Sequence, residues 1–255
     1  MSTPDGVVMK RTILLVGVLA SLSAGAYVLP GGSILRRMLA AREDLPLTLK
    51  ADGSLHFYGP GVKEAGAALG LPTDRPELEA DGTVYMRVPG RCRFEARAQE
   101  GNAVASVSSE GRKRVEGTEI PAVSEAVQQL CAVLAVRGDS TGDVREALDG
   151  YLRSLGIDPR VTSLARFGGD VVYVLGQQAE GKSQFWVYKD AFRPARLRYK
   201  DGKGTEWDVR FLDYTSSATG ELMPRTLEVW RGTERVLRFT ALTGDTRARM
   251  ADTLF

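Results

Sequence analysis

The sequence predicts an α+β fold in which helices cover the apolar face of a long antiparallel β-sheet. Short segments that alternate apolar and polar residues recur through residues 161–241 and are separated by glycine-rich turns. This arrangement is typical of an antiparallel meander. Between residues 120 and 155 the apolar residues instead repeat with the period of a helix. A sheet with one apolar face needs a second layer, so we expect these helices to pack on that face.

Residues 1–26 have the features of a secretory signal peptide. Lys10 and Arg11 precede the apolar run of residues 13–20, and Ala24-Gly25-Ala26 fits the small-residue pattern of a cleavage site. The apolar run is shorter than the roughly 20 residues that span a bilayer. We therefore expect an exported, periplasmic protein in which residues 27–255 form a single domain.

The sequence bears on the start of the chain, on cleavage of this N-terminal segment and on acylation. Met9 is an alternative start, and an uncleaved anchor helix that continues to Leu29 is an alternative to cleavage. Residues 22–25 resemble those before the acylated cysteine of a lipoprotein, but the next residue is Ala26. We therefore expect that the protein is not itself a lipoprotein.

The residues after the signal segment are expected to form two helices and a β-hairpin. The apolar side chains of residues 33–43 recur at helical spacing. Residues 45–58 alternate on both sides of Asp52-Gly53, which predicts a hairpin with its turn at that pair. A short helix over residues 62–69 and a loop over residues 71–80 follow.

Strands are expected on both sides of the central helices. Asp81-Gly82 predicts another turn, and the strand after it ends at Pro89-Gly90. The central helices are predicted over residues 120–136 and 141–155, the second ended by Gly156. The predicted strands are residues 83–88, 91–98, 103–108, 171–175, 184–189, 195–200, 206–214, 226–231 and 235–241.

The composition gives no support for catalysis, metal binding or nucleic-acid binding. The net charge is only +2, which is not the charge of a nucleic-acid-binding domain. His56 is the only histidine and falls in a predicted strand, so neither a catalytic triad nor a metal site is indicated. We therefore expect a protein that is not an enzyme and has no cofactor.

Residues 176–183, from Gly176 to Ser183, match the P-loop pattern and follow a hydrophobic strand. A P-loop needs a helix next, because amide groups at the helix N-terminus hold the phosphate. The residues that follow, 184–188, are aromatic and β-branched and favour a strand. We interpret the match as a hairpin loop and expect no nucleotide.

The sequence has two cysteines, Cys92 and Cys131. In an exported protein an even number of cysteines favours a disulfide bond. Two separate buried cysteines are the alternative. Metal binding by these thiols is not indicated, because the sequence has no CxxC pair.

Basic residues gather in two places. Arg112, Lys113 and Arg114 form a run that we interpret as a solvated loop; a docking patch for an acidic partner or anionic lipid headgroups is the alternative. Arg87 and Arg91 flank the predicted proline turn. Solvated arginines at a structural turn are the simpler interpretation, and lid or docking contacts are the alternative.

Residues 81–94 and 185–197 resemble segments of the periplasmic lipoprotein-carrier family with the LolA/LolB-like fold. The first, DGTVYMRVPGRCRF, is similar to a strand of that family that ends in a proline turn and continues to an aromatic residue. The preceding helix, residues 33–43, also fits. The resemblance covers most of residues 27–255 and implies an open half-barrel whose apolar concave face is covered by helices.

The resemblance also implies a carrier rather than a catalyst. Such carriers take acylated lipoproteins from an inner-membrane extraction complex and pass them to an outer-membrane receptor. That receptor is itself a lipoprotein, so Ala26 favours the carrier. The apolar sides of the clearly alternating strands then supply the expected cavity lining, here called the lining set: Val84, Met86, Phe94, Leu197, Tyr199, Trp207, Val209, Phe211, Leu227 and Val229.

One departure from the family concerns the lid. Carriers of the family commonly have an arginine just before the proline, which holds the lid by hydrogen bonds. Val88 stands at that position here, and alternation puts Arg87 on the opposite face. The lid-holding role of that arginine, here called the latch, therefore cannot be assigned to a residue of this sequence. A Cys92–Cys131 bond that ties the turn strand to a lid helix is our hypothesis for a different tether.

Two other functions fit the same sequence. One is an envelope lipid-sensing or regulatory binding protein on the same fold, although such a regulator needs a second domain for which the chain has little room. The other is an interaction protein with a fully packed core and no ligand. Lipid that purifies with the protein distinguishes both a carrier and a lipid sensor from this last function.

Overall fold

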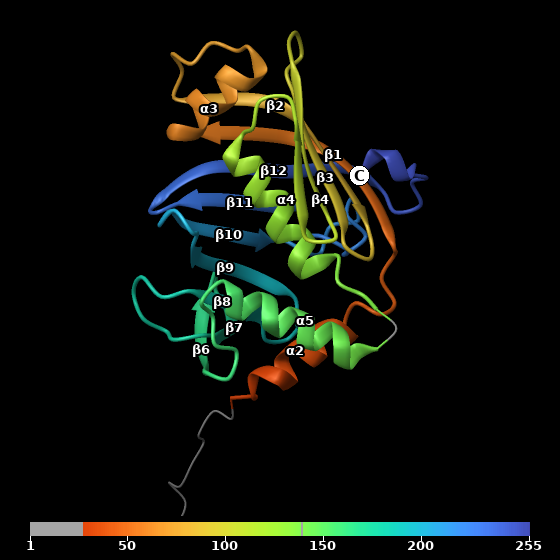
Figure 1. The fold of residues 1–255 in the computed structure, drawn as a ribbon, viewed down its shortest axis with the longest axis vertical. Helices are drawn as coiled ribbons and strands as arrows, with labels where there is room; N and C mark the ends of the chain where they lie inside the picture. The colour runs from red at the N-terminus through yellow and green to blue at the C-terminus, as the bar shows by residue number, and fades with distance from the viewer. Residues whose placement is uncertain (1–27, 139) are drawn as a thin grey trace, which may run out of the picture.

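The computed structural model describes residues 28–138 and 140–255, and in them one antiparallel sheet wraps around helices (Figure 1). The sheet has twelve strands in the order β5-β4-β3-β2-β1-β12-β11-β10-β9-β8-β7-β6. The strands are β1 (Thr48–Tyr58), β2 (Glu77–Arg87), β3 (Arg91–Arg97), β4 (Ala103–Ser109), β5 (Arg112–Glu116), β6 (Thr162–Phe167), β7 (Asp170–Leu175), β8 (Gln184–Tyr188), β9 (Pro194–Lys200), β10 (Glu206–Leu212), β11 (Thr226–Arg231) and β12 (Glu234–Asp245).

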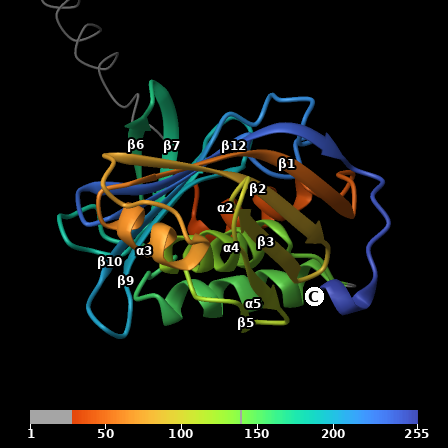
Figure 2. The ribbon, with the colours of Figure 1, turned by 90° about the horizontal axis from the view of Figure 1, so that it is seen from above.

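The helices are α2 (Gly31–Ala40), α3 (Pro60–Leu69), α4 (Pro121–Leu134) and α5 (Thr141–Ser154), and a short 3₁₀ turn, η2 (Asp252–Leu254), ends the chain. Seen from above, the strands form an arch whose open side is closed by α4 and α5 (Figure 2). The sheet does not close on itself, because β5 and β6 are its two edges. The fold is therefore an open α+β half-barrel, as the sequence predicts.

Helix α4 lies against the concave face of the sheet and is buried on almost every side. Pro121 begins it, because proline lacks the N–H that a first helical residue leaves unpaired. Val123, Val127, Leu130 and Leu134 form an apolar stripe at helical spacing, and all four are fully or almost fully buried. The arch surrounds this helix, which explains why it also buries residues outside the stripe.

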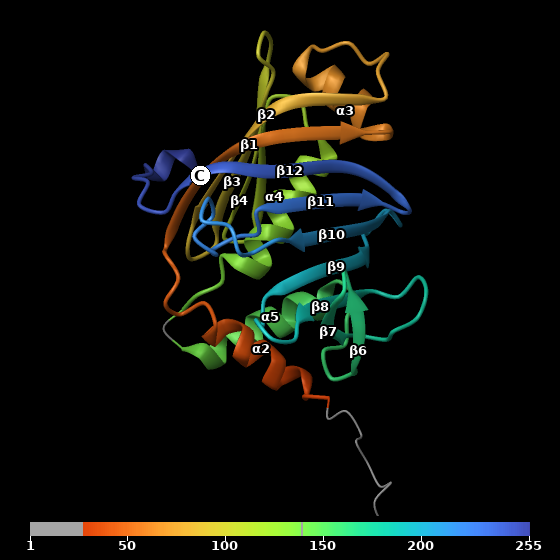
Figure 3. The ribbon, with the colours of Figure 1, turned by 180° about the vertical axis from the view of Figure 1, so that it is seen from behind.

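Helices α2 and α5 pack against each other beside the lower strands of the half-barrel (Figure 3). In α2 the predicted apolar face is confirmed, since Ile34, Leu35 and Met38 are fully buried. Helix α5 differs, because Leu148 and Leu152 are its only buried residues. We call α2, α4 and α5, which lie over the concave face, the cover. Its firmly packed part is α4, and α5 is packed more loosely.

The predicted turns at Asp52-Gly53 and Asp81-Gly82 are wrong. Both pairs lie inside long strands, and Gly53 is directly paired with Gly82 across β1 and β2. The register of β1 against β12 shifts between Asp52 and Gly53, which marks a β-bulge. A Cβ atom on Gly53 would lie 2.1 Å from the carbonyl oxygen of Thr240. The glycine therefore permits a close approach of two strands rather than a turn.

Two further differences concern strand extent. Strand β2 begins at Glu77, inside the predicted loop, and the basic run at residues 112–114 is part of the edge strand β5 rather than a loop. Charged side chains are common on edge strands, where they discourage pairing with another chain. The predicted signal segment lies outside the described residues. Among the described residues, the structure has no helix with the length and apolarity needed to cross a membrane.

Candidate functional site

The lining set gathers on one side of the sheet, as alternation predicts. Val209 is paired with Leu197 on one side and with Val229 on the other, and Val84 is paired with Phe94. All members belong to one hydrophobic cluster together with α4, and none is more than 6% exposed. Whether they line a ligand cavity stays a prediction.

The helices cover this concave face completely in the structure. Five surface cavities have volumes between about 240 and 430 Å³, and no member of the lining set borders any of these five. The sheet and α4 are in direct contact along strands β3, β4 and β9 to β12. Access of a ligand to the lining set therefore requires a movement of the covering helices.

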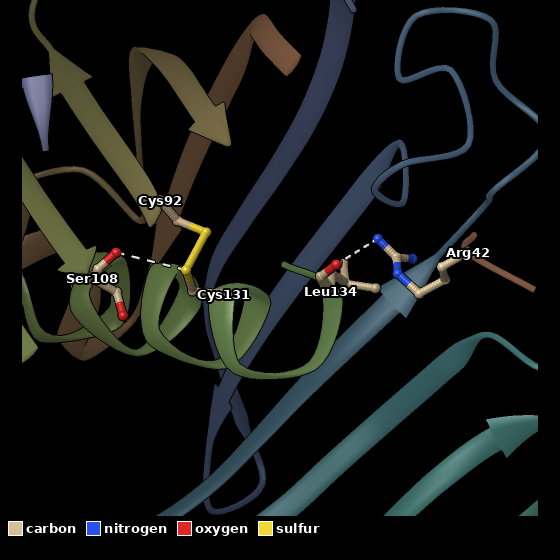
Figure 4. The surroundings of a disulfide bond; sticks show 5 residues. All are labelled: Arg42, Cys92, Ser108, Cys131 and Leu134. Carbon is tan, nitrogen blue, oxygen red and sulfur yellow. Dashed lines mark hydrogen bonds between the residues drawn. A yellow bond between two sulfur atoms is a disulfide. The ribbon is translucent and has the colours of Figure 1, made fainter. Parts of the chain in front are cut away.

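A disulfide bond between Cys92 and Cys131 ties α4 to the sheet (Figure 4). Cys92 lies at the start of β3, directly after the proline turn, and Cys131 lies near the end of α4. The C-terminal end of α4 is also held by a second contact, because the amide of Gly90 donates a 2.7 Å hydrogen bond to the carbonyl oxygen of Ala135. The predicted tether is thus present and acts on the C-terminal end of α4.

Arg42 makes a third contact with this end of α4 and was not identified from the sequence. Its Nη2 donates a hydrogen bond to the carbonyl oxygen of Leu134 at 2.6 Å (Figure 4). The same nitrogen donates to the carbonyl oxygen of Leu222 at 2.9 Å. Arg42 is only 6% exposed, and burial lowers its pKa to about 10. In sequence, Arg42 is one of several charged residues at the end of the predicted helix 33–43, and nothing marks it as buried.

The N-terminal and middle turns of α4 are held by a chain of polar side chains. Tyr151 of α5 donates to the Oε1 of Gln129, whose Nε2 donates to the hydroxyl of Tyr199 at 2.7 Å. Tyr199 in turn donates to the carboxylate of Glu125. Gln129 is fully buried. These contacts connect α5, α4 and β9 through a single hydrogen-bond path.

Burial raises the pKa of Glu125 above its ordinary value, and it raises the pKa of Tyr199 and Tyr151 as well. The physical cause is the same for all three groups, because a charge is less stable away from water. A nearby pair, Ser106 of β4 and Ser124 of α4, shares a buried hydrogen bond of 2.9 Å. Polar contacts therefore anchor α4 at both ends of an otherwise apolar interface.

The predicted latch position, Val88, makes no lid contact of the expected kind. Its amide donates to the carbonyl oxygen of Leu47, and the Val88–Pro89 peptide bond is cis. Arg87 and Arg91 lie on the outer face, where both contact Asp252. These two arginines therefore do not hold the covering helices.

The other charged candidates lie on the surface. Lys113 and Arg114 of β5 pair with Glu119 and Glu116 respectively, and Arg112 is exposed. The patch is therefore solvated, although it lies in a strand. His56 of β1 contacts Glu77. No group of three or more metal-ligating side chains occurs within residues 28–138 and 140–255.

The P-loop-like segment from Gly176 to Ser183 is the loop between β7 and β8, as the sequence analysis expects. Gln184 closes this loop, because its Nε2 donates to the carbonyl oxygens of Gln177 and Ala179 at 2.7 and 3.2 Å. A strand follows, so the helix N-terminus that would hold phosphate is missing from this described part of the chain.

No protein-family model matches the chain. No curated protein matches it either. Solved structures do resemble it. A LolA superfamily protein from Nitrosomonas europaea superposes with a TM-score of 0.52 and 11% identity, over 89% of this chain and 97% of the other.

Two further structures have lower scores. An outer membrane lipoprotein-sorting protein domain from Vibrio parahaemolyticus has a TM-score of 0.48 and 12% identity, over 88% of this chain and 94% of the other. A chain of the Pseudomonas aeruginosa MucA/MucB complex has a TM-score of 0.31 and 15% identity, over 88% and 60%. The similarity to the Nitrosomonas europaea protein and the open half-barrel together show that the chain has the LolA-like fold.

Proposed function

We propose that the protein is a periplasmic carrier that binds acyl chains of lipoproteins on the concave face of its sheet and moves them from the inner to the outer membrane. The observation that carries this proposal is the continuous apolar surface formed by the lining set beneath helices rather than beneath a second sheet. Helices that cover a sheet can move as units without breaking strand pairing. The disulfide bond supports export, because such bonds persist in oxidising compartments.

Acyl binding has a sufficient driving force. Each buried CH₂ group stabilises a complex by about 0.8 kcal/mol, so a long acyl chain outweighs the loss of several helix contacts. A carrier must also release its cargo, which sets a limit on how firmly the open state is favoured. A cover that closes on its own apolar face meets this need, because the closed state competes with the ligand for the same surface.

We propose that α2 and α5 move while α4 stays in place. Helix α4 is bound to the sheet by the disulfide bond and by the Gly90 contact, whereas α5 buries only Leu148 and Leu152. The polar contacts between the α2–α5 side and α4 include two hydrogen bonds, from Arg42 to Leu134 and from Tyr151 to Gln129. Release of these contacts gives a ligand access from the side of β7 to β9.

The test is native mass spectrometry of residues 27–255 purified without detergent, followed by titration with a palmitoylated peptide. The same peptide without the acyl chain is the control. Uptake of one acylated peptide per protein, without uptake of the control, supports the carrier. A clean mass without bound lipid, and no uptake at any concentration below the critical micelle concentration, contradicts it.

A second candidate is an interaction protein with no ligand. The complete burial of the lining set favours this function, because a permanently closed core needs no cargo. The native mass spectrum separates the two candidates, since only a carrier takes up the acylated peptide. An enzyme is not proposed, because no cluster of reactive side chains in the described residues suggests one.

A further inference from the structure

Three arginines form a strip on the outer face of β2 and β3. Arg87 is directly paired with Arg91, and Arg93 is paired with Tyr85. Their sequence neighbours Met86, Cys92 and Phe94 are fully buried on the inner face, so the arginines point to the outside. We call Arg87, Arg91 and Arg93 the arginine strip.

The last part of the chain, residues 246–255, lies across the arginine strip. Asp252 accepts hydrogen bonds from Arg87 and, at 3.0 Å, from Nη1 of Arg91. The strip also takes main-chain groups, because Arg87 donates to the carbonyl oxygen of Met250 and Arg93 to that of Leu254, both at 3.2 Å. The guanidinium of Arg87 lies 5.6 Å from the ring centre of Phe255.

These contacts define a peptide-binding mode. One carboxylate of the segment lies between two guanidinium groups of the strip. The strip also binds two main-chain carbonyl groups and an aromatic ring three residues after the carboxylate. Charged hydrogen bonds and a cation–aromatic contact are the strong forms of such interactions. The strip therefore recognises a short segment with an aspartate and a following aromatic residue.

The segment is held weakly. None of residues 246–255 is buried, and the Asp252 side chain is 78% exposed. Exposed ion pairs contribute little, because water screens them and long side chains lose entropy. A cavity of about 430 Å³ is lined on one side by part of the segment and on the other by sheet residues that include Lys50 and Tyr85. The segment can therefore leave the strip without disturbing the core.

When residues 246–255 leave the strip, Arg87 and Arg91 lose Asp252 as an ion-pair partner. Among the described residues, Arg87 forms its ion pair with Asp252 alone, and Arg91 retains only Glu110 at 3.7 Å. Arg93 keeps Glu95 and Glu116. The two arginines at the proline turn would then attract an anionic segment of another protein.

We propose that the arginine strip is a docking surface for an acidic peptide segment of a partner protein, and that residues 246–255 occupy it as an internal competitor. This inference is independent of whether the protein carries acyl chains. The strip is close to the cover, since Gly90, which holds Ala135 at the end of α4, directly precedes Arg91. A partner bound at Arg91 therefore contacts the turn to which α4 is anchored.

The experiment uses a fluorescently labelled peptide of residues 246–255 as the probe and fluorescence anisotropy as the readout. The wild type is compared with Asp252→Lys in the full chain and with a chain that ends at Asp245. An attached segment has an effective concentration in the millimolar range. In Asp252→Lys and in the shortened chain, here called the released forms, the strip is free of this competitor. For a peptide with a Kd near about 100 μM, we expect binding to either released form to be about tenfold tighter than to the wild type.

Matched variants assign the binding site. In the Asp252→Lys background, Arg91→Gln should weaken peptide binding several-fold, whereas Arg97→Gln, at an exposed arginine of the same strand, should leave it unchanged. A peptide in which Arg247 and Arg249 are replaced by glutamate should bind several-fold more tightly than the natural segment, and its affinity should fall as salt is added.

Three results would overturn the proposal: no binding to either released form, equal binding to the released forms and the wild type, or equal losses from Arg91→Gln and Arg97→Gln. Thermal unfolding by circular dichroism confirms that each variant is folded. The two released forms are independent, so misfolding of the shortened chain leaves the Asp252→Lys comparison decisive. Acyl-peptide uptake by native mass spectrometry reports separately on the carrier function.

Discussion

The guanidinium group of Arg42, which follows helix α2, donates a 2.6 Å hydrogen bond to the carbonyl oxygen of Leu134, the last residue of α4. The same nitrogen reaches Leu222, so one buried cation joins three parts of the chain. Arg42 thus supplies a hydrogen-bond donor to two buried main-chain carbonyl groups. Arg42 therefore links the α2 side of the covering helices to the end of α4, as Tyr151 links α5 to its middle.

Replacement of Arg42 by methionine, which has a similar length and no charge, should loosen the cover. The two carbonyl oxygens lose their donor, and we expect the free energy of unfolding to fall by about 1–3 kcal/mol. Uptake of an acylated peptide should become faster in stopped-flow fluorescence. Arg36→Met, an exposed position of α2, is the control and should change neither quantity. Equal uptake rates in both variants would remove Arg42 from the closing mechanism.

The disulfide bond should contribute substantially to stability. Cys92 and Cys131 are 39 residues apart, and the chain-entropy estimate for a loop of that length is about 4 kcal/mol, within a usual range of about 0–5. The double variant Cys92→Ala, Cys131→Ala should unfold at a clearly lower denaturant concentration than the wild type. Reductant should lower the stability of the wild type and leave the double variant unchanged. Two free thiols in the unreduced wild type would contradict the bond.

Stability should depend on the protonation of Glu125. Its folded-state pKa is raised by burial, so the folded protein binds this proton more tightly than the unfolded chain. This contribution is fully present below the unfolded pKa and is lost as the pH rises through the folded pKa. The free energy of unfolding should therefore fall with increasing pH in the window that begins near the ordinary pKa of glutamate, about 4.3.

Glu125→Gln should remove this part of the pH dependence and be more stable than the wild type above the window. Lys113 and Asp201 also lie within electrostatic reach of Glu125, with opposite effects on its pKa. The amide of the substituted side chain keeps an oxygen that can accept from Tyr199. Denaturant unfolding between about pH 4 and pH 8 compares the two proteins, with Glu110→Gln, an exposed glutamate, as control. Parallel pH profiles for wild type and Glu125→Gln would exclude a role for Glu125.

The sheet faces could be predicted from the sequence because strands β9, β10 and β11 alternate regularly. Val209 and Phe211 are fully buried, while Arg210 between them is on the outer face. Tryptophan was less informative. Trp207 packs in the main core, but Trp186 belongs to a small apolar cluster on the outer face and Trp230 packs against Arg210. A large aromatic side chain can pack on either face of a sheet, so its identity alone does not fix its side.

The contacts that close the cover could be predicted only in part. The Cys92–Cys131 bond was expected, since an even number of cysteines favours pairing in an exported protein. Arg42 and Gln129 were missed, because burial of a single polar residue depends on which distant elements meet around it. Their partners Leu222 and Tyr199 are 180 and 70 residues away in the sequence. Local patterns contain no information at such separations.

The bulge at Gly53 shows why an Asp-Gly pair was misinterpreted, and it provides a direct test. In a turn, glycine is needed for its backbone angle, but in β1 it is needed because the β12 backbone lies too close for a side chain. Gly53→Ala should therefore destabilise the protein by about 1–3 kcal/mol, since the carbonyl oxygen of Thr240 must move. Gly202→Ala, in a turn with open space around it, should be neutral or slightly stabilising. Chemical denaturation measures both, and equal stability of the two variants would mean that β1 and β12 separate at the bulge without cost.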